Sequence, residues 1–413
     1  MRYIRNPPRA PQGHTQPGVL PVHKRSPQTT VTPHWLSHTL NQHQASIQDP
    51  HRKDMETPLK MEDSQPPAKT EMWWGTLGTV RPFPDFNPLK DAQEVKTALE
   101  KKDGNTMVRI LTNRTNAQRQ LITRAYHSLT GKDMSFTLKK CLSGALQELM
   151  LGLMMTPSQF DAHRLRQAME GLGTDEETLL EVLCTRSAEQ LKDITVAYKQ
   201  EFDRYLENDL ISETSKDFTT LLLAILTKQR ENQQGVIDYE LIDGDINTLT
   251  DAFSNKRVDM ASWIKVLTTR DAEHLNRVLS KWEQVQGVLV EKVIQNHFSG
   301  DLKLGFCILV QSIQNSPRYL AHRLLTSMKK SSVVRGVLVS HCEEDLLSIR
   351  VEFRRLAGLS LYSALQEVHN FQLCHLLSLI KQWRQRVSIK VIKIHVGLFH
   401  GSSQCWLQIA GIF

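Results

Sequence analysis

The sequence VLCTRSAEQ at residues 182–190 occurs in four versions along this 413-residue chain. The other versions are ILTNRTNAQ at 110–118, VLTTRDAEH at 266–274 and VLVSHCEED at 337–345. Each version ends an apolar helical segment and then supplies polar residues of the kind that begin a new helix. The chain is therefore predicted to consist largely of one repeated helical unit.

The start of the second helix in each copy has a capping pattern. The expected caps are Thr115, Ser187 and Asp271. A side chain three residues after the cap position completes a capping box in a favourable sequence, and this position holds Gln118, Gln190, His274 and Asp345. His274 is the exception, because it is neither an acid nor an amide. We expect buried anchors about eight residues later, at Tyr126, Tyr198 and Phe353.

The spacing of the copies indicates the size of the unit. Arg114, Arg186, Arg270 and His341 are about 70 residues apart, with a longer interval between the second and third. A unit of about 70 residues exceeds the common two-helix solenoid repeats and holds four or five helices of ordinary length. The fold class is therefore predicted to be all-α. The longer interval predicts a connector that includes 235–238 and a turn at 243–245.

The two ends of the chain differ from the repeats. Residues 1–73 hold 11 of the 16 prolines and few positions able to form a core, so we expect a disordered N-terminal region. Residues 382–413 form a basic, irregular tail in which apolar and polar residues alternate at 387–391, as in a short strand. This tail is unrelated to the repeats.

Composition narrows the class of function. The net charge of +7 favours an anionic partner. The sequence contains no run of 18 apolar residues, so no membrane span is predicted. The six cysteines form no CxxC pair, which is typical of a reduced, cytoplasmic protein. No nucleotide-binding, hydrolase or EF-hand motif is present, so we do not expect an enzyme. Basic stretches interleaved with stacking aromatics are also absent, so we expect no nucleic acid partner and favour an acidic lipid surface.

One stretch of the second copy carries a more specific motif. Residues 169–176 read MEGLGTDE, Arg186 follows, and Glu213 lies 40 positions after Gly173. With WGTLGT at 74–79 and SLYS at 360–363, this pattern resembles the annexin family over residues 74–380, and most of all an atypical member with degraded calcium sites. The resemblance implies four repeats of about five helices each, forming a curved disc. The repeats are expected at 84–155, 156–230, 239–314 and 315–381.

The resemblance also implies a calcium site in the second repeat. Its ligands would be the carbonyl groups of Met169, Gly171 and Gly173 and the carboxylate of Glu213. Calcium takes six to eight oxygen ligands, and water or a lipid phosphate can complete the set. With one carboxylate, the affinity without lipid is expected in the range of about 10⁻⁴ to 10⁻³ M. The alternative is that Gly171 and Gly173 only shape a turn.

The other repeats depart from the pattern. The first has a shortened loop around Lys102, with Gln147 at the position expected for the acid and Glu148 beside it. The third has Arg257 in place of a glycine and His297 in place of the acid. The fourth is several residues short, and Glu367 lies near its acid position without a loop partner.

The basic residues of these altered loops allow two interpretations. They are Lys101, Lys102, Lys256, Arg257, Lys329 and Lys330. They are either solvated remnants of lost sites or direct contacts to anionic lipid, each contributing about 1 kcal/mol near the surface. The two functions left open are calcium-dependent binding to phospholipid at the periphery of a membrane, and a calcium-independent interaction scaffold.

Overall fold

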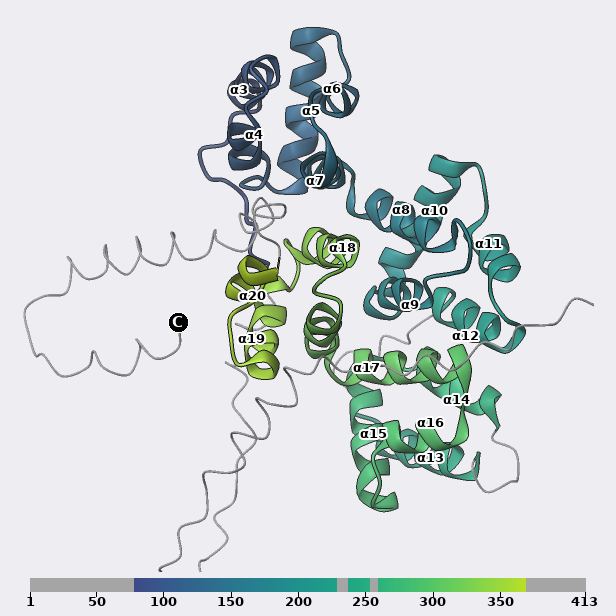
Figure 1. Ribbon diagram of the computed structural model, residues 1–413. Helices are drawn as coiled ribbons and strands as arrows, with labels where there is room; N and C mark the ends of the chain where they lie inside the picture. The colour runs from purple at the N-terminus through teal and green to yellow at the C-terminus, as the bar shows by residue number, and fades with distance from the viewer. Residues whose placement is uncertain (1–77, 229–236, 253–258, 369–413) are drawn as a thin grey trace, which may run out of the picture. The chain divides into compact units, whose positions relative to one another are not determined.

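The computed structural model describes residues 78–228, 237–252 and 259–368. Within these ranges the chain forms eighteen α-helices, α3 to α20, and no β-strand (Figure 1). The predicted all-α class is therefore confirmed. The predicted disordered region 1–73 and the basic tail 382–413 lie outside the described residues.

The first two repeats each contain five helices in the same order. We assign to the first repeat α3 (Pro88–Glu100), α4 (Gly104–Leu111), α5 (Asn116–Thr130), α6 (Met134–Cys141) and α7 (Gly144–Met154). We assign to the second repeat α8 (Pro157–Met169), α9 (Glu176–Thr185), α10 (Ala188–Phe202), α11 (Leu206–Glu213) and α12 (Lys216–Leu226).

The third repeat runs directly into the fourth. It contains α13 (Tyr239–Asp251), α14 (Met260–Thr269), α15 (Ala272–Gln286), α16 (Val290–His297) and the first part of α17 (Gly300–Thr326). The second part of α17 begins the fourth repeat, which continues with α18 (Ser331–His341), α19 (Leu346–Ala357) and α20 (Leu361–Val368).

A kink at Asn315 divides α17 between these repeats. Asn315 has non-helical backbone angles, with φ −161° and ψ 87°. Its side-chain oxygen accepts a hydrogen bond from the Arg318 amide at 2.9 Å, as an N-cap does. Pro317 follows in the first turn, where the missing amide proton costs little. Residues 316–326 therefore form a separate helix, equivalent to α3 and α8.

The predicted caps are present in the first three repeats. Thr115 and Ser187 form complete capping boxes with Gln118 and Gln190. Asp271 accepts from the His274 amide at 2.9 Å, but the His274 ring turns away to Asp245. In all three copies the cap satisfies an amide that the helix itself leaves unpaired.

Two local predictions are wrong. The predicted turn at 243–245 lies inside α13, because Asp245 faces the core and pairs with Arg270. The predicted capping box at Asp345 is absent: α19 starts only at Leu346, and the Asp345 side chain caps no amide. Asp345 instead accepts a hydrogen bond from the His341 ring, 2.6 Å away. In both cases the acid pairs with another side chain, which is four residues away for Asp345 and 25 residues away for Asp245.

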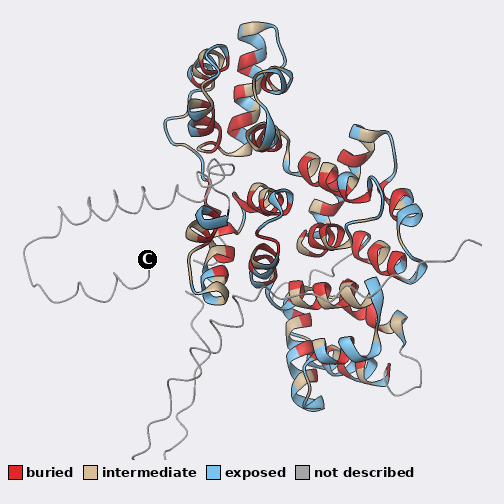
Figure 2. Ribbon diagram, in the orientation of Figure 1, coloured by how far each residue is buried: buried red, intermediate tan, exposed pale blue. Residues whose placement is uncertain are grey.

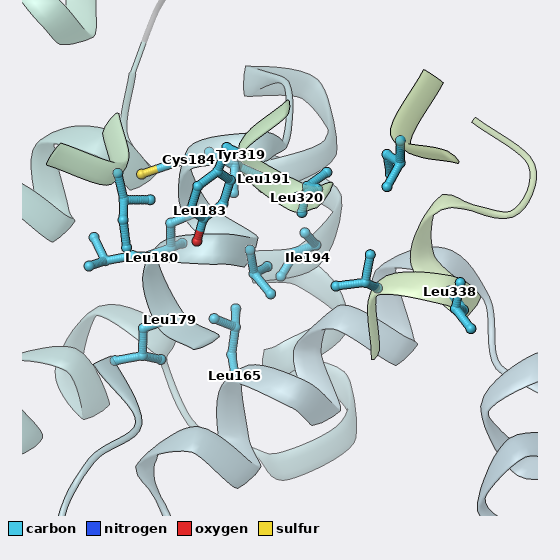
Figure 3. Close-up of a cluster of buried hydrophobic side chains, with 14 of the residues drawn as sticks. Leu165, Leu179, Leu180, Leu183, Cys184, Leu191, Ile194, Tyr319, Leu320 and Leu338 are labelled. Atoms are coloured by element: carbon cyan, nitrogen blue, oxygen red, sulfur yellow. The ribbon is translucent and has the colours of Figure 1, made fainter. Parts of the chain in front are cut away.

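Each helix buries one side against its neighbours (Figure 2). The predicted anchors Tyr126, Tyr198 and Phe353 are all buried, which confirms them as core residues. One part of the core joins α8, α9 and α10 to the fourth repeat, through Leu165, Leu183, Tyr319, Leu320 and Leu338 (Figure 3). The second and fourth repeats therefore share a continuous apolar core.

A buried ion pair recurs in the first three repeats. The repeated arginine binds an acid from the first helix of its own repeat, in the pairs Arg114–Asp91, Arg186–Asp161 and Arg270–Asp245. Arg186 Nε lies 2.6 Å from Asp161 Oδ2, and Ser340 donates to the same carboxylate at 2.8 Å. Burial would raise the pKa of Asp161, but the Arg186 guanidinium holds it below its ordinary value.

The fourth repeat lacks this pair. Alignment of YLAHRL at 319–324 with FDAHRL at 160–165 puts Leu320 in the place of Asp161. His341 replaces the arginine, and its Nε2 lies 3.1 Å from Arg186 Nη1. Because a guanidinium only donates, Nε2 accepts and Nδ1 donates to Asp345. The ring therefore connects Asp345 of its own repeat to Arg186 of the second repeat.

A polar junction also joins the first, second and fourth repeats. Glu343 accepts hydrogen bonds from the Asn116 amide at 2.7 Å and from Arg119 at 2.8 Å. A cavity of about 300 Å³ lies here, and its walls include Asp161 and Arg186. Two ion pairs lie on its walls, Arg119–Glu343 between the first and fourth repeats and Arg186–Asp161 within the second, so the junction helps to hold the repeats together.

Candidate metal site

The loop between α8 and α9 has a backbone that requires glycine. It comprises six residues, 170–175. Gly171 has φ 100° and Gly173 has φ 94°, in the region that L side chains rarely adopt. A Cβ at either position would meet no atom within 4 Å, so the requirement is conformational and not steric crowding. The loop closes where the Asp175 amide donates to the Ala168 carbonyl at 2.8 Å.

The loop is joined to the end of α11, far away in sequence. Glu213 is the last residue of α11, and its carbonyl accepts a hydrogen bond from Thr174 Oγ1 at 3.0 Å. Glu213, Gly171 and Gly173 are all exposed, while the Met169 side chain is buried and anchors the start of the loop. The four residues implied as calcium ligands therefore lie at two neighbouring chain segments.

The available donors suit a hard cation. They are backbone carbonyls and one carboxylate, the oxygen ligands that calcium prefers. In the described ranges no three His, Cys, Asp or Glu side chains gather as a metal-binding group. The arrangement therefore does not provide the nitrogen and sulfur ligands typical of zinc. Calcium fits the residues present, with most of its ligands from the backbone, water or lipid.

Acidic side chains surround the start of α9. Asp175 caps the helix by accepting from the Thr178 amide at 3.1 Å and from its hydroxyl at 2.8 Å. Burial raises the pKa of Glu176, and the nearby charges of Asp301, Asp175 and Glu177 raise it further. Negative potential at this point favours a bound cation.

Leu172 forms the tip of the loop. It lies between the two glycines and is 110% exposed relative to the reference value. Covering this apolar side chain would lower the free energy, by about 1.5–3 kcal/mol for a fully buried leucine. This residue was not singled out from the sequence, although its place between two glycines would have identified it.

The first repeat has a shorter loop, as predicted. Residues 101–103 separate α3 from α4, and Lys102 takes the left-handed conformation with φ 52°. Lys101 and Lys102 are exposed. The Asp103 amide still donates to the Ala98 carbonyl at 2.8 Å, so the closing hydrogen bond survives without the glycines.

The prediction that Gln147 occupies the acid position is wrong. Gln147 lies inside α7, whereas the residue that ends α6, as Glu213 ends α11, is Cys141. The error arose because the position was counted from a shortened loop. The neighbouring Glu148 is engaged elsewhere, with Arg335 of α18 at 2.6 Å.

The third repeat keeps the spacing of the closing hydrogen bond but not the residues of the loop. Its closing hydrogen bond runs from the Asp259 amide to the Ala252 carbonyl at 3.0 Å. His297 ends α16, in the position of Glu213, as predicted. Lys256 and Arg257 lie outside the described residues.

The fourth repeat has four residues, 327–330, between its first two helices. Lys329 and Lys330 are exposed, and Lys330 precedes α18 without a side-chain cap. Alignment of α20 with α11 from their first residues puts Val368 in the place of Glu213, one residue after Glu367. The loop of the fourth repeat is shorter than that of the second, as predicted, and the loss of a calcium site there stays a prediction.

The fold and this loop define a class of four-repeat helical proteins. Annexin A9 of Homo sapiens is 38% identical over 300 residues, which cover 71% of this chain and 86% of that protein. An annexin family profile matches residues 90–153 and 160–225. The chain belongs to the annexin family, whose members generally bind phospholipid in a calcium-dependent manner.

Solved structures agree with this assignment. Annexin III matches with a TM-score of 0.71 and 33% identity, over 75% of this chain and 98% of that chain. Chicken annexin V, solved in complex with Zn²⁺, matches with a TM-score of 0.67 and 34% identity, over 74% and 98%. In the part of the chain that the structure describes, no helix is long and apolar enough to cross a bilayer.

Proposed function

We propose that this protein binds anionic phospholipid membranes in a calcium-dependent manner, chiefly through one calcium site in the second repeat. The carbonyls of Met169, Gly171 and Gly173 and the carboxylate of Glu213 would hold the ion. The observation that carries the proposal is the tie between the glycine loop and α11, through the Thr174–Glu213 hydrogen bond of 3.0 Å. No other described loop combines paired positive-φ glycines with a carboxylate.

The ion would act as a bridge between protein and lipid. A calcium ion with few protein ligands keeps coordination sites for water and for a phosphate or carboxylate of a lipid headgroup. Leu172 would then reach the boundary between headgroups and acyl chains. A single bridge gains nothing from multivalency, so we expect weaker binding than in a protein with several sites.

Charge would support this contact. The net charge of +7 and the exposed Lys101, Lys102, Lys329 and Lys330 favour an anionic surface. Lysines beside a membrane contribute about 1 kcal/mol each, and less as salt rises. We place this activity at the cytoplasmic face of membranes, as a peripheral association, with lipid and not nucleic acid as the partner.

The test is co-sedimentation of the full chain with vesicles of phosphatidylserine and phosphatidylcholine, in calcium or in chelator. We expect calcium-dependent binding that Glu213→Gln removes, since the amide lacks the charge the ion requires. Asp217→Asn, in the first turn of α12, is the matched control and should bind as the wild type does. Equal binding in calcium and chelator would favour the alternative, a calcium-independent interaction scaffold that uses the exposed lysines.

A further inference from the structure

We propose that Arg323, in the fourth repeat, is a positioning residue for the calcium loop of the second repeat, defined here as residues 169–175. Calcium binding to that loop is therefore coupled to the packing of the fourth repeat against the second. This inference rests on the proposed calcium site.

Arg323 is buried between the two repeats. It lies in the second part of α17, and its side chain is 3% exposed. Its guanidinium binds Glu177, donates to Thr178 Oγ1 at 3.3 Å and lies 3.4 Å from Glu181 Oε2. One guanidinium thus holds three side chains of α9, using the fork of donors that arginine provides.

These contacts reach the residue that closes the calcium loop. Asp175 Oδ1 lies 3.9 Å from Arg323 Nη2. The Asp175 side chain also accepts from Thr178, which is bound to Arg323. The Asp175 amide in turn donates to Ala168 at 2.8 Å and closes the loop. A shift of the guanidinium therefore moves the first turn of α9 and the end of the loop together.

Among the four repeats, only the second has the two acids that pair with Arg323. The positions of Glu177 and Glu181 hold other residues in the other repeats. They are Asn105 and Arg109 in the first repeat, Ala261 and Lys265 in the third, and Ser332 and Gly336 in the fourth. The repeat whose loop keeps both glycines is thus also the repeat whose following helix offers a pair of acids. This association is what a coupling between the acids and the glycine loop predicts.

Glu181 makes the connection rigid. It is 1% exposed and accepts a second arginine, Arg164 Nη2, at 2.7 Å. The Arg164 guanidinium packs against Gly336 of α18, where a Cβ would approach it to 2.6 Å. Arg164 and Arg323 therefore clamp one buried carboxylate from two repeats, and this carboxylate cannot move without breaking a charged pair.

The coupling predicts a reciprocal effect. If the fourth repeat holds the calcium loop in its binding geometry, bound calcium stabilises the contact between the repeats to the same extent. Lysine in place of Arg323 keeps the charge but cannot hold Glu177, Thr178 and Glu181 together. The Arg323→Lys substitution therefore distinguishes an effect of the three contacts from an effect of the positive charge.

The experiment measures the half-saturating calcium concentration for vesicle binding and the rise in Tm that calcium causes, for full-length Arg323→Lys, Arg323→Gln and Arg335→Lys. Arg335 is the matched control, because it is a largely buried arginine of the fourth repeat that pairs with the first repeat through Glu148. We expect Arg323→Lys to raise the half-saturating concentration about fivefold or more and to reduce the calcium-dependent rise in Tm. Arg335→Lys should change Tm without changing calcium dependence.

Four results would count against the proposal or against the function on which it rests. Equal calcium dependence in Arg323→Lys and Arg335→Lys would show a structural role alone. Wild-type behaviour of Arg323→Lys with tighter calcium binding in Arg323→Gln would show that Arg323 acts by its charge. A wild-type chain without calcium dependence would refute the proposed function itself. By contrast, calcium dependence that Glu213→Gln removes and Arg323→Lys leaves intact would refute only the coupling.

Discussion

The second and fourth repeats share a fold but differ in the two places where repeats of this kind carry polar chemistry. The second has a six-residue loop with two positive-φ glycines and an internal Asp161–Arg186 pair. The fourth has a four-residue loop, Leu320 in place of the acid and His341 in place of the arginine. The glycine loop can be replaced by a shorter loop without loss of the fold, because the helices on either side pack through their apolar faces.

The largest expected effect is on the buried pair of the second repeat. Asp161→Asn should lower the free energy of unfolding by about 3–5 kcal/mol at neutral pH, because Arg186 is left buried without its partner. The measurement is denaturant unfolding. Asp203→Asn is the control, because Asp203 is exposed and asparagine also tolerates its left-handed conformation.

The same variant has a predictable pH dependence. The pKa of Asp161 is lowered in the folded state, so its stabilisation is present above its unfolded pKa of about 3.9 and is lost as the pH falls further. The difference between wild type and Asp161→Asn should therefore shrink below about pH 4. A constant difference down to pH 2 would contradict this pairing.

The second effect concerns the loop backbone. Gly173→Ala forces a side chain into φ 94°, at a cost of about 1–3 kcal/mol in the binding geometry. We expect the half-saturating calcium for vesicle binding to rise about tenfold. Gly131→Ala, at φ 66° in the first repeat, should affect stability but not calcium dependence. If both variants bind calcium alike, Gly173 shapes no more than a turn.

The third effect concerns the tip of the loop. Leu172→Ala removes apolar area that membrane contact would cover, so vesicle binding at saturating calcium should weaken by about 1–2 kcal/mol. Val196→Ala, an exposed aliphatic residue of α10, provides the comparison. Unchanged binding of Leu172→Ala would place the tip outside the bilayer.

The smallest effect tests whether the lysines of the fourth repeat contact the membrane directly. The double variant Lys329→Gln, Lys330→Gln should weaken binding to anionic vesicles by at most about 1 kcal/mol per charge, and only at low salt. The same change at Lys192 and Lys199 of α10 is the control. Equal effects of the two double variants would identify Lys329 and Lys330 as solvated charge, without a direct lipid contact.

Several features could be predicted from local sequence because they depend on local chemistry. The caps at Thr115 and Ser187 and the buried Tyr126 follow from short-range pattern. Predictions failed where another side chain competed for the acid. Asp345 caps no helix because His341 claims it, and Asp245 lies in a helix because Arg270 draws it into the core.

The acid position of the first repeat shows a different limit. Counting along the chain gave Gln147, and the end of α6 gives Cys141. A shortened loop changes the count but not the helix ends, because the helices are set by packing. In a repeat with a shortened loop, the register is therefore read more safely from helix boundaries than from motif spacing.

The sequence by itself determined the repeated helical fold, the family and the glycine loop with Glu213, because these depend on periodic apolar positions and on glycine at defined spacing. The tertiary structure alone decided which distant groups meet. Examples are Thr174 with Glu213, His341 with Arg186, and Arg323 with the start of α9. Such contacts depend on how helices pack within a repeat and on how repeats pack against one another, and no short-range pattern in the chain encodes them.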